Sequence, residues 1–519
     1  MGKTQGAAVL AEHEDLSAVR SRLGVPGYFL AILIVITLVA ALLRFYGLGN
    51  RGFWLDETFS LDPPHQTETN MAFYYLLLRL WVKLGTSEVF VRTMSVVFSV
   101  ATLPLLYAVG ARLFGRNAGL LAAWLLALNA FHIHYAQEAR AYALVVLMGT
   151  AATYLLVRNI RLPERATWLL YGAFLALTVY SHLFAVFLVA AHAACLLCLP
   201  RRRIPWKGML YSAVCFVCLT LPAVVLALMT TYDPLNWVPR TNWPIVRSYL
   251  ELNAGNGGLV LLVLDGIVLF VFILMMGRHW LQNGRTLESW GGAIVLSWFF
   301  VPFLLTLTVS AFRPIFVPRF LLFTLPGFLL GLSAALTRIR PRMLAWVLGI
   351  GISLLGLAAV PDCYHLSGVM DDWRLITSYV LDRAQPGDQV FLHPDYVSIP
   401  FEFYRGRRSP QPEWPELAKP GESPKEKSAL QESKREGSLH PPATLRFWIV
   451  FYHTQPSAQT RQNLRANLDL WQNLGWTLRE AHEFANVSVL LFLAHSPQVP
   501  PAALPNLSHP DLAPGDAHP

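Results

Sequence analysis

Long apolar runs alternate with short polar loops over the first 360 residues of the chain. A helix needs about 20 mostly apolar residues to cross a bilayer. Eleven runs come near this length, at about 27–46, 88–110, 117–133, 139–157, 168–181, 182–199, 209–229, 258–277, 290–311, 318–336 and 343–360. The pattern therefore predicts a polytopic α-helical membrane protein with about 11 transmembrane helices, to within one or two.

The pattern changes after residue 360. Helical spacing at Trp373–Ala384 and Ser457–Leu474 alternates with strand-like runs at Gln389–Leu392, Arg446–Tyr452 and Val487–Ala494. Such alternation predicts a small α/β domain over residues 361–496, and Asp371-Asp372-Trp373 is interpreted as a helix cap with a packed Trp. Residues 406–443 are rich in Pro, Lys, Glu and Ser, which predicts a disordered insertion, and the Pro-rich residues 497–519 predict a disordered tail.

Composition and charge support this division of the chain. Hydrophobic residues make up 54% and charged residues 14%, whereas soluble domains carry about 25% charged residues. The net charge of +9 comes mainly from alternate loops, which hold Arg112, Arg116, Arg158, Arg161, Arg165, Arg201, Arg202, Arg203, Lys207, Arg278, Arg285, Arg338, Arg340 and Arg342. Basic loops stay in the cytoplasm. We therefore expect a cytoplasmic N-terminal segment at 1–26, a membrane domain at 27–360 and an extracytoplasmic C-terminal domain.

The sequence favours neither zinc binding nor nucleic-acid binding. Cys195-x-x-Cys198 and Cys215-x-x-Cys218 have zinc-ribbon spacing, but both pairs lie inside apolar runs, where no polar residues would orient the ligands. They are interpreted as small residues of membrane helices, and Cys363 stands apart from both pairs in the sequence. The basic residues form no stripe with interleaved aromatics, so no nucleic-acid partner is expected.

The first outward loop carries the strongest candidate chemistry. Asp56 and Glu57 are adjacent in Gly52-Phe53-Trp54-Leu55-Asp56-Glu57, just after the first apolar run. Paired carboxylates at a membrane boundary suit a general base or a cation site; a solvated acid pair is the alternative. The stretch Asn70–Trp81, which includes Tyr75, has helical spacing and predicts an amphipathic helix in the interface.

Three later motifs place polar residues at the same membrane face. Glu138 and Arg140 lie close to a predicted span, where charges are costly unless they are paired or functional. His182 follows Tyr180-Ser181 between two apolar runs, and Arg319 stands in Pro318-Arg319-Phe320. Arginine suits a phosphate because its planar fork matches the oxygens. The alternatives are a structural Glu138–Arg140 contact, an ordinary polar histidine and an interfacial anchor.

Taken in order, these motifs resemble the GT-C superfamily of polyprenyl-phosphate-sugar transferases. The bacterial proteins grouped with protein O-mannosyltransferases, aminoarabinose transferases and Rgt-type galacturonosyltransferases are the most similar. The resemblance covers about residues 45–330 and includes Ser87-Glu88 with Arg92, and Leu113–Arg116. Many relatives have His-Pro-Pro-Leu-Tyr-Tyr before the leucine run. Here that segment begins with Asn70, so Asn70 is the polar residue that could replace the histidine.

The resemblance implies an inverting glycosyltransferase. Its donor would be a sugar on a polyprenyl phosphate, and its acceptor a hydroxyl of a lipid, glycan or protein. It implies Asp56 as general base with Glu57 beside it, and a bacterial inner-membrane location within the cell envelope. Substrate-binding roles would fall on Asn70, Tyr75, Glu138, Arg140, His182 and Arg319, with Arg319 and then Arg140 facing the phosphate. No cofactor is implied with certainty; a divalent cation, if used, would be held by Asp56, Glu57 and Glu138.

Two other classes of protein remain as alternatives. A transporter or lipid flippase would also have many spans, but such proteins often show two related halves with broken helices. The sequence shows no such repeat, and its charged residues gather at one face of the membrane. A membrane scaffold that assembles through the C-terminal domain would tolerate substitutions in the Asp56 loop.

Overall fold

The computed structural model describes residues 27–62, 70–229, 235, 237–365, 371–408, 416–417, 444–453 and 476–495. The chain forms two compact units. The helical unit comprises Met1–Leu48 and Pro63–Tyr364, and the sheet unit comprises Gly49–Asp62 and His365–Pro519. The loop that carries Asp56 therefore groups with the C-terminal part of the chain, a grouping that the sequence did not suggest.

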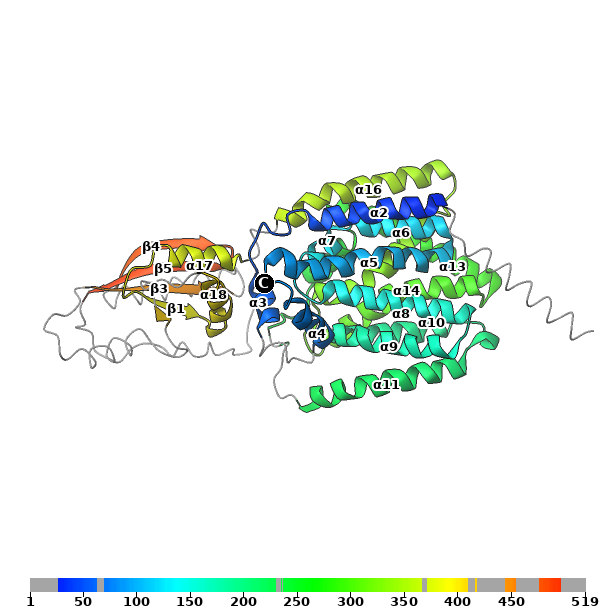
Figure 1. Cartoon of the computed structure of the whole chain (residues 1–519). Coiled ribbons are helices and arrows are strands. Elements are labelled where there is room, and N and C mark those ends of the chain that lie inside the picture. The colour runs from blue at the N-terminus through cyan, green and yellow to red at the C-terminus, as the bar shows by residue number, and fades with distance from the viewer. Residues whose placement is uncertain are drawn as a thin grey trace, which may run out of the picture. The chain divides into compact units, whose positions relative to one another are not determined.

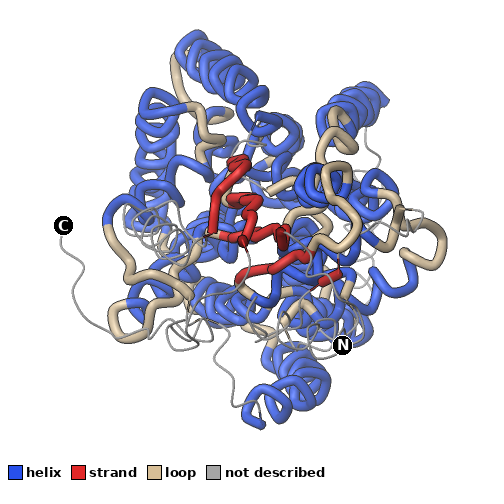
Figure 2. The backbone as a smooth tube through the Cα atoms, turned by 90° about the vertical axis from the view of Figure 1, so that its left-hand side faces the viewer, coloured by secondary structure: helices blue, strands red, loops and turns tan. Residues whose placement is uncertain are grey.

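The helical unit is built from long helices that run side by side (Figures 1 and 2). They are α2 (Gly27–Phe45), α4 (Ala72–Trp81), α5 (Glu88–Phe114), α6 (Arg116–Leu128), α7 (Ala130–Ala136), α8 (Tyr142–Arg161), α9 (Arg165–Ser181), α10 (Val186–Leu196), α11 (Trp206–Met229), α12 (Trp243–Asn253), α13 (Gly258–Asn283), α14 (Leu287–Ser310), α15 (Leu325–Leu336) and α16 (Arg342–His365). Short 3-10 helices connect them at η2 (Leu183–Ala185), η3 (Arg201–Arg203) and η4 (Pro318–Thr324).

Apolar helices coincide with all eleven predicted spans, and the predicted polytopic fold class is confirmed. By length and composition, eight of the described helices can cross a membrane, or nine if α6 and α7, which meet at 62°, form one broken span. The break lies at Asn129, whose backbone is extended and whose side chain caps α7 by accepting from the amide of His132. The two other predicted spans correspond to α9, with 17 residues, and to the shorter apolar segment Leu183–Leu196.

Burial separates a central helix from peripheral ones. In the span that joins η4 to α15, 94% of the apolar window is buried, whereas the figure is 22% for α11 and 17% for α16. The peripheral helices expose large side chains such as Leu210 and Trp346, as helices that face lipid do. The Pro318-Arg319-Phe320 motif therefore lies at the start of the most enclosed span.

The sheet unit contains a five-stranded mixed sheet with strand order β2-β1-β3-β5-β4. The strands are β1 (Gln389–His393), β2 (Glu416–Leu417), β3 (Thr444–Tyr452), β4 (Trp476–Phe484) and β5 (Val487–His495). β1 pairs in parallel with β2 and β3, and β5 pairs antiparallel with β3 and β4. The helices α3 (Leu55–Leu61), α17 (Trp373–Leu381) and α18 (Ser398–Arg405), with the 3-10 helix η6 (Asp395–Val397), complete the unit, which confirms the predicted α/β class.

The sequence did not predict β4, and it did not predict β2, which lies inside the predicted disordered insertion at 406–443 and pairs with β1. Trp476–Phe484 is rich in polar residues, and no residue of the strand is fully buried. At an edge of the sheet the strand pairs on one side only, so it does not need the apolar pattern of a central strand. The predicted helix at Ser457–Leu474, nearly all of the predicted insertion at 406–443 and the segments 1–26 and 497–519 lie outside the described residues.

Candidate active site

The two acids of the first loop have different environments in the sheet unit. Glu57 is fully buried, and its Oε2 accepts a hydrogen bond from the backbone amide of Trp54 at 3.2 Å, which helps to cap α3. Asp56 is half-buried on the same first turn. Asp56 is therefore the more accessible of the two carboxylates, while a capping role accounts for Glu57.

A second carboxyl group lies close to Asp56. Asp371 is 3% exposed and receives hydrogen bonds from Asn486 and Tyr452. Burial raises the pKa of Asp371 to about 6, and the negative charge of Asp56 adds to this effect. Burial also raises the pKa of Tyr452, with further contributions from the charges of Asp371 and Asp56. Asp56 thus stands beside a polar group that is buried in the sheet unit.

Sequence reasoning missed Asp371 as a neighbour of Asp56. It predicted a helix cap at Asp371-Asp372-Trp373, and the cap is present. The side chain of Asp372 accepts from the amide of Leu375 at 3.1 Å, and Trp373 is fully buried. No local pattern could have paired Asp371 with Asp56, because they are far apart along the chain.

In the helical unit, the predicted residues Tyr75 and Arg140 are in direct contact. Nη1 of Arg140 donates to the hydroxyl of Tyr75 at 3.4 Å. The carbonyl of Arg140 accepts from Ser95 Oγ at 3.3 Å. Tyr75 comes from α4 and Ser95 from α5, so the predicted interfacial helix packs against the turn that carries Arg140.

The predicted residues Asn70 and His182 both make hydrogen bonds at the break between α9 and η2. Oδ1 of Asn70 accepts from the amide of Leu183 at 3.2 Å. Nδ1 of His182 accepts from the amide of Phe184 at 3.3 Å, which leaves the proton of a neutral ring on Nε2. His182 is buried, and its Nε2 has no hydrogen-bond partner within the described part of the chain.

The charges of two arginines reach His182. Both Arg140 and Arg319 lie within electrostatic reach of its ring, and the ring centroid is 4.8 Å from that of Phe320. The guanidinium of Arg319 lies 5.5 Å from the ring centroid of Trp237, a cation–π contact that orients it. Two guanidinium groups beside a neutral polar ring form an environment suited to an anion.

The turn from His132 to Arg140 is held by buried polar contacts. Nδ1 of His132 accepts from Nη2 of Arg44 at 2.9 Å, and Nε2 of Gln137 donates to the carbonyls of Arg44 and Tyr46 at 3.0 and 2.7 Å. Glu138, which is fully buried, places Oε1 3.1 Å from Nε2 of His134. His132 and Gln137 therefore have structural roles.

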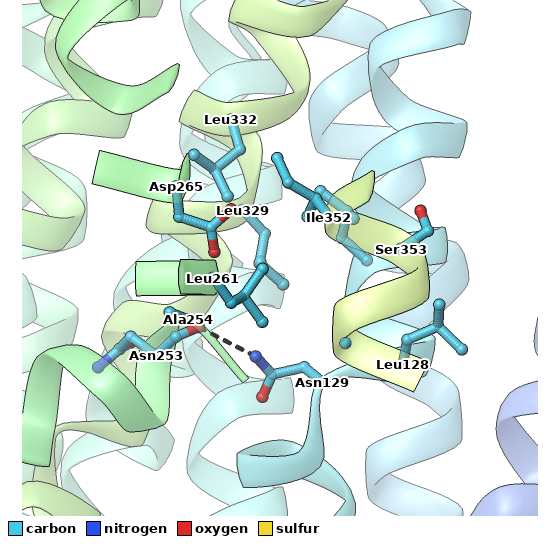
Figure 3. A pocket seen from close by; sticks show the side chains of 12 residues that line it. Leu128, Asn129, Asn253, Ala254, Leu261, Asp265, Leu329, Leu332, Ile352 and Ser353 are labelled. Carbon is cyan, nitrogen blue, oxygen red and sulfur yellow. Dashed lines mark hydrogen bonds between the residues drawn. The ribbon is translucent and has the colours of Figure 1, made fainter. Parts of the chain in front are cut away.

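A separate cavity of about 310 Å³, including its open side, lies among α6, α13, α15 and α16 (Figure 3). Its polar lining includes Asn129, Asn253 and Asp265, and Nδ2 of Asn129 donates to the carbonyl of Asn253 at 3.0 Å. Leucine and isoleucine supply much of the remaining lining. None of the predicted site residues lines this cavity.

Over the described ranges, no group of three or more His, Cys, Asp or Glu side chains is placed to hold a metal ion. Cys195 lies next to His192, with its Sγ 3.1 Å from the carbonyl of His192. The ring of His192 contacts Thr153 and Tyr171 at 3.1 and 3.0 Å, which satisfies both of its nitrogens inside the bundle.

Comparison with known proteins identifies similar sequences and folds. Residues 71–227 match the family model described as dolichyl-phosphate-mannose-protein mannosyltransferase. The crystal structure of apo ArnT from Cupriavidus metallidurans matches with a TM-score of 0.56 and 11% identity, covering 88% of this chain and 97% of ArnT. The same protein bound to undecaprenyl phosphate matches with a TM-score of 0.54 and 11% identity, covering 90% and 98%. No curated protein sequence matches the chain.

The family match and the structural similarity cover different extents of the chain. The family model spans α4 to α11, which contain Tyr75, Glu138, Arg140 and His182. The similarity to ArnT extends over nearly the whole length of both chains and shows a shared fold. Both agree with the resemblance that the motifs indicated, while the roles of the individual site residues stay predictions.

Proposed function

We propose that this chain is a membrane glycosyltransferase, and that it moves a sugar from a polyprenyl phosphate to an acceptor hydroxyl on the outer face of the membrane. The family match over residues 71–227 and the fold shared with ArnT support the proposal. The observation that carries the proposal is the proximity of Arg319, Phe320 and His182: the Phe320 ring lies 4.8 Å from the ring of His182 and 5.8 Å from the guanidinium of Arg319. The charge of Arg140 also reaches the ring of His182. A phosphate that leaves during sugar transfer needs such groups. Undecaprenyl phosphate, which the similar ArnT structure contains, supplies the chemical class of the donor.

Asp56 would act as the general base. It would accept the proton of the acceptor hydroxyl while that oxygen forms a bond to the anomeric carbon of the sugar. The bond from the anomeric carbon to the phosphate oxygen breaks, and its electron pair leaves with the polyprenyl phosphate. One displacement of this kind inverts the configuration of the sugar. Because phosphate is a good leaving group, no strong acid is required.

The remaining predicted residues would bind substrate. Arg319, and then Arg140, would stabilise the charge of the leaving phosphate, since each presents a planar fork of donors. Asn70 and Tyr75, which lie near His182 and Arg140, would orient the sugar. Glu138 would accept hydrogen bonds from sugar or acceptor hydroxyls. The acceptor hydroxyl would belong to a lipid, a glycan or a protein.

A label-transfer assay tests this function. Membranes that contain the protein, incubated with a radiolabelled polyprenyl-phosphate sugar, should move label into an acceptor fraction, and membranes without the protein should not. The nucleotide-linked form of the same sugar, supplied to sealed right-side-out membrane vesicles, should give no transfer. Movement of intact labelled lipid between leaflets, with no new glycoside, would instead favour the transporter or flippase alternative. No movement of label with any sugar donor would favour the scaffold.

The orientation of the chain is a second part of the proposal. The alternation of basic loops supports a cytoplasmic N-terminus and an extracytoplasmic sheet unit, and the family resemblance favours a bacterial inner membrane. A single cysteine at position 56, in a variant without native cysteines, should react with a membrane-impermeant maleimide in intact spheroplasts. A cysteine at position 202 should react only after the membrane is opened. The reverse pattern would exclude an extracytoplasmic Asp56.

A further inference from the structure

The segment just before α3 is bound closely to the C-terminal part of the sheet unit. The amide of Gly52 donates to Oδ2 of Asp372 at 2.9 Å, and the amide of Phe53 donates to the hydroxyl of Tyr404 at 2.5 Å. Gly52 and Asp372 are separated by 320 residues along the chain. Two successive backbone amides are thus fixed by side chains from α17 and α18 or their caps.

Gly52 fits where a larger residue would not. A Cβ at this position would lie 2.7 Å from Cβ of Arg374 and 3.0 Å from the hydroxyl of Tyr404, and it would collide with Asp372 Oδ1. Real Cβ atoms essentially never approach other heavy atoms this closely. Gly52 is therefore needed for close approach of the backbone.

Aromatic contacts extend this attachment on both sides of Asp56. Phe53 is fully buried, and its ring centroid is 5.6 Å from that of Phe403 in an edge-on arrangement. On the other side, the ring of Phe59 lies 6.2 Å from that of Tyr396, also edge-on. Contacts before and after Asp56 leave the short helix α3 little freedom to turn, and Asp56 keeps its place beside Asp371.

We propose that the C-terminal α/β domain is the positioning element of the catalytic loop, with Asp372 and Tyr404 holding the backbone of Gly52 and Phe53 so that Asp56 keeps its working orientation. Neither residue is a catalytic residue, since each acts through the loop. The proposal rests on the proposed function of Asp56 as general base. It assigns to the C-terminal domain a part in the chemistry that is separate from any binding of acceptor or partner.

The proposal predicts an effect on turnover without an effect on donor binding. A displacement of about 1 Å at a reacting group can lower a rate about 10²-fold. The donor's phosphate is assigned to arginines of the helical unit, which these changes do not touch. Loss of the Tyr404 or Gly52 contacts should therefore lower kcat by about 10²-fold and leave the donor KM nearly unchanged.

Tyr404→Phe and Gly52→Ala test this in the full-length protein in membranes, with kcat and donor KM measured by label transfer. Tyr379→Phe is the matched control for the first, because its hydroxyl donates to Glu480 in the same unit. Gly406→Ala is the control for the second, because a Cβ there meets only the Glu402 carbonyl at 3.3 Å and the Phe403 carbonyl at 3.9 Å. Both controls should retain wild-type kcat. Melting temperatures in detergent accompany each measurement.

The outcomes separate a positioning role from a merely structural one. If Tyr404→Phe and its control lower the melting temperature equally and only Tyr404→Phe lowers kcat, positioning is supported. Unchanged kcat in Tyr404→Phe, or kcat that falls in both variants in proportion to melting temperature, overturns it. An inactive Asp56→Asn together with a fully active Tyr404→Phe would reject this inference alone, whereas an active Asp56→Asn would reject the proposed function.

Discussion

Asp56→Asn is expected to lower the rate of sugar transfer by about 10²–10⁴-fold, the usual contribution of a positioned general base. The amide cannot accept the acceptor's proton, yet it has nearly the same size as the carboxylate. Asp56 is half-buried rather than part of the core, so the variant should insert and fold like the wild type. Label transfer, normalised to the amount of protein in the membrane, measures the effect.

Two other variants of the same segment serve as controls for Asp56→Asn. Asp62→Asn makes the same chemical change at the C-terminal end of α3 and should remain close to wild type. Glu57→Gln keeps an oxygen that can accept from the amide of Trp54, so its loss should be smaller than that of Asp56→Asn. Turnover by Asp56→Asn within a few-fold of wild type would rule out Asp56 as the base.

Arg319→Ala should reduce kcat by about 10²–10³-fold, the effect of removing one donor that stabilises developing negative charge. The cation–π contact with Trp237 orients the guanidinium, and the ring of Phe320 lies 5.8 Å from it on the same motif. Arg319→Lys keeps the charge but loses the planar fork, so an intermediate loss is expected. Single-turnover label transfer with a saturating donor measures the chemical step directly.

Arg313→Ala provides the matched control for Arg319. Arg313 is exposed and stands six residues earlier in the same outward segment. Its removal lowers the positive charge of that segment equally. If the leaving phosphate needs an arginine at position 319 and not merely a positive charge in this segment, Arg313→Ala should reduce kcat only slightly. Equal losses in the two variants would mean that neither arginine contacts the leaving phosphate specifically.

The sequence alone determined the membrane fold and the order of the motifs. Spans such as Gly258–Asn283 are recognisable because a bilayer imposes one requirement on every helix, an apolar surface about 20 residues long. The strands β1, β3 and β5 were predicted for a similar reason, since each carries a short apolar run. These signals are local, so a single sequence is enough to predict the spans and the strands.

Tertiary structure decided which polar residues are neighbours. Glu57 and Asp56 are adjacent in sequence, but only packing buries one and leaves the other accessible. The ring of His182 is within electrostatic reach of two arginines that come from different elements, Arg140 before α8 and Arg319 in η4. Hydrogen bonds and charges act over a few ångströms in space, whatever the separation of the residues along the chain. A local sequence pattern therefore does not predict them.

The attachment of the Asp56 loop to the C-terminal part of the chain is the clearest example of a feature that only the tertiary structure determines. Its motif indicated a chemical role, but nothing near residue 52 reveals that its partners lie at residues 372–404. Hydrophobic periodicity is a property of consecutive residues, so it is visible in the sequence itself. The fit of a glycine against a distant aspartate and tyrosine depends on how two remote segments pack, and it exists only in the folded chain.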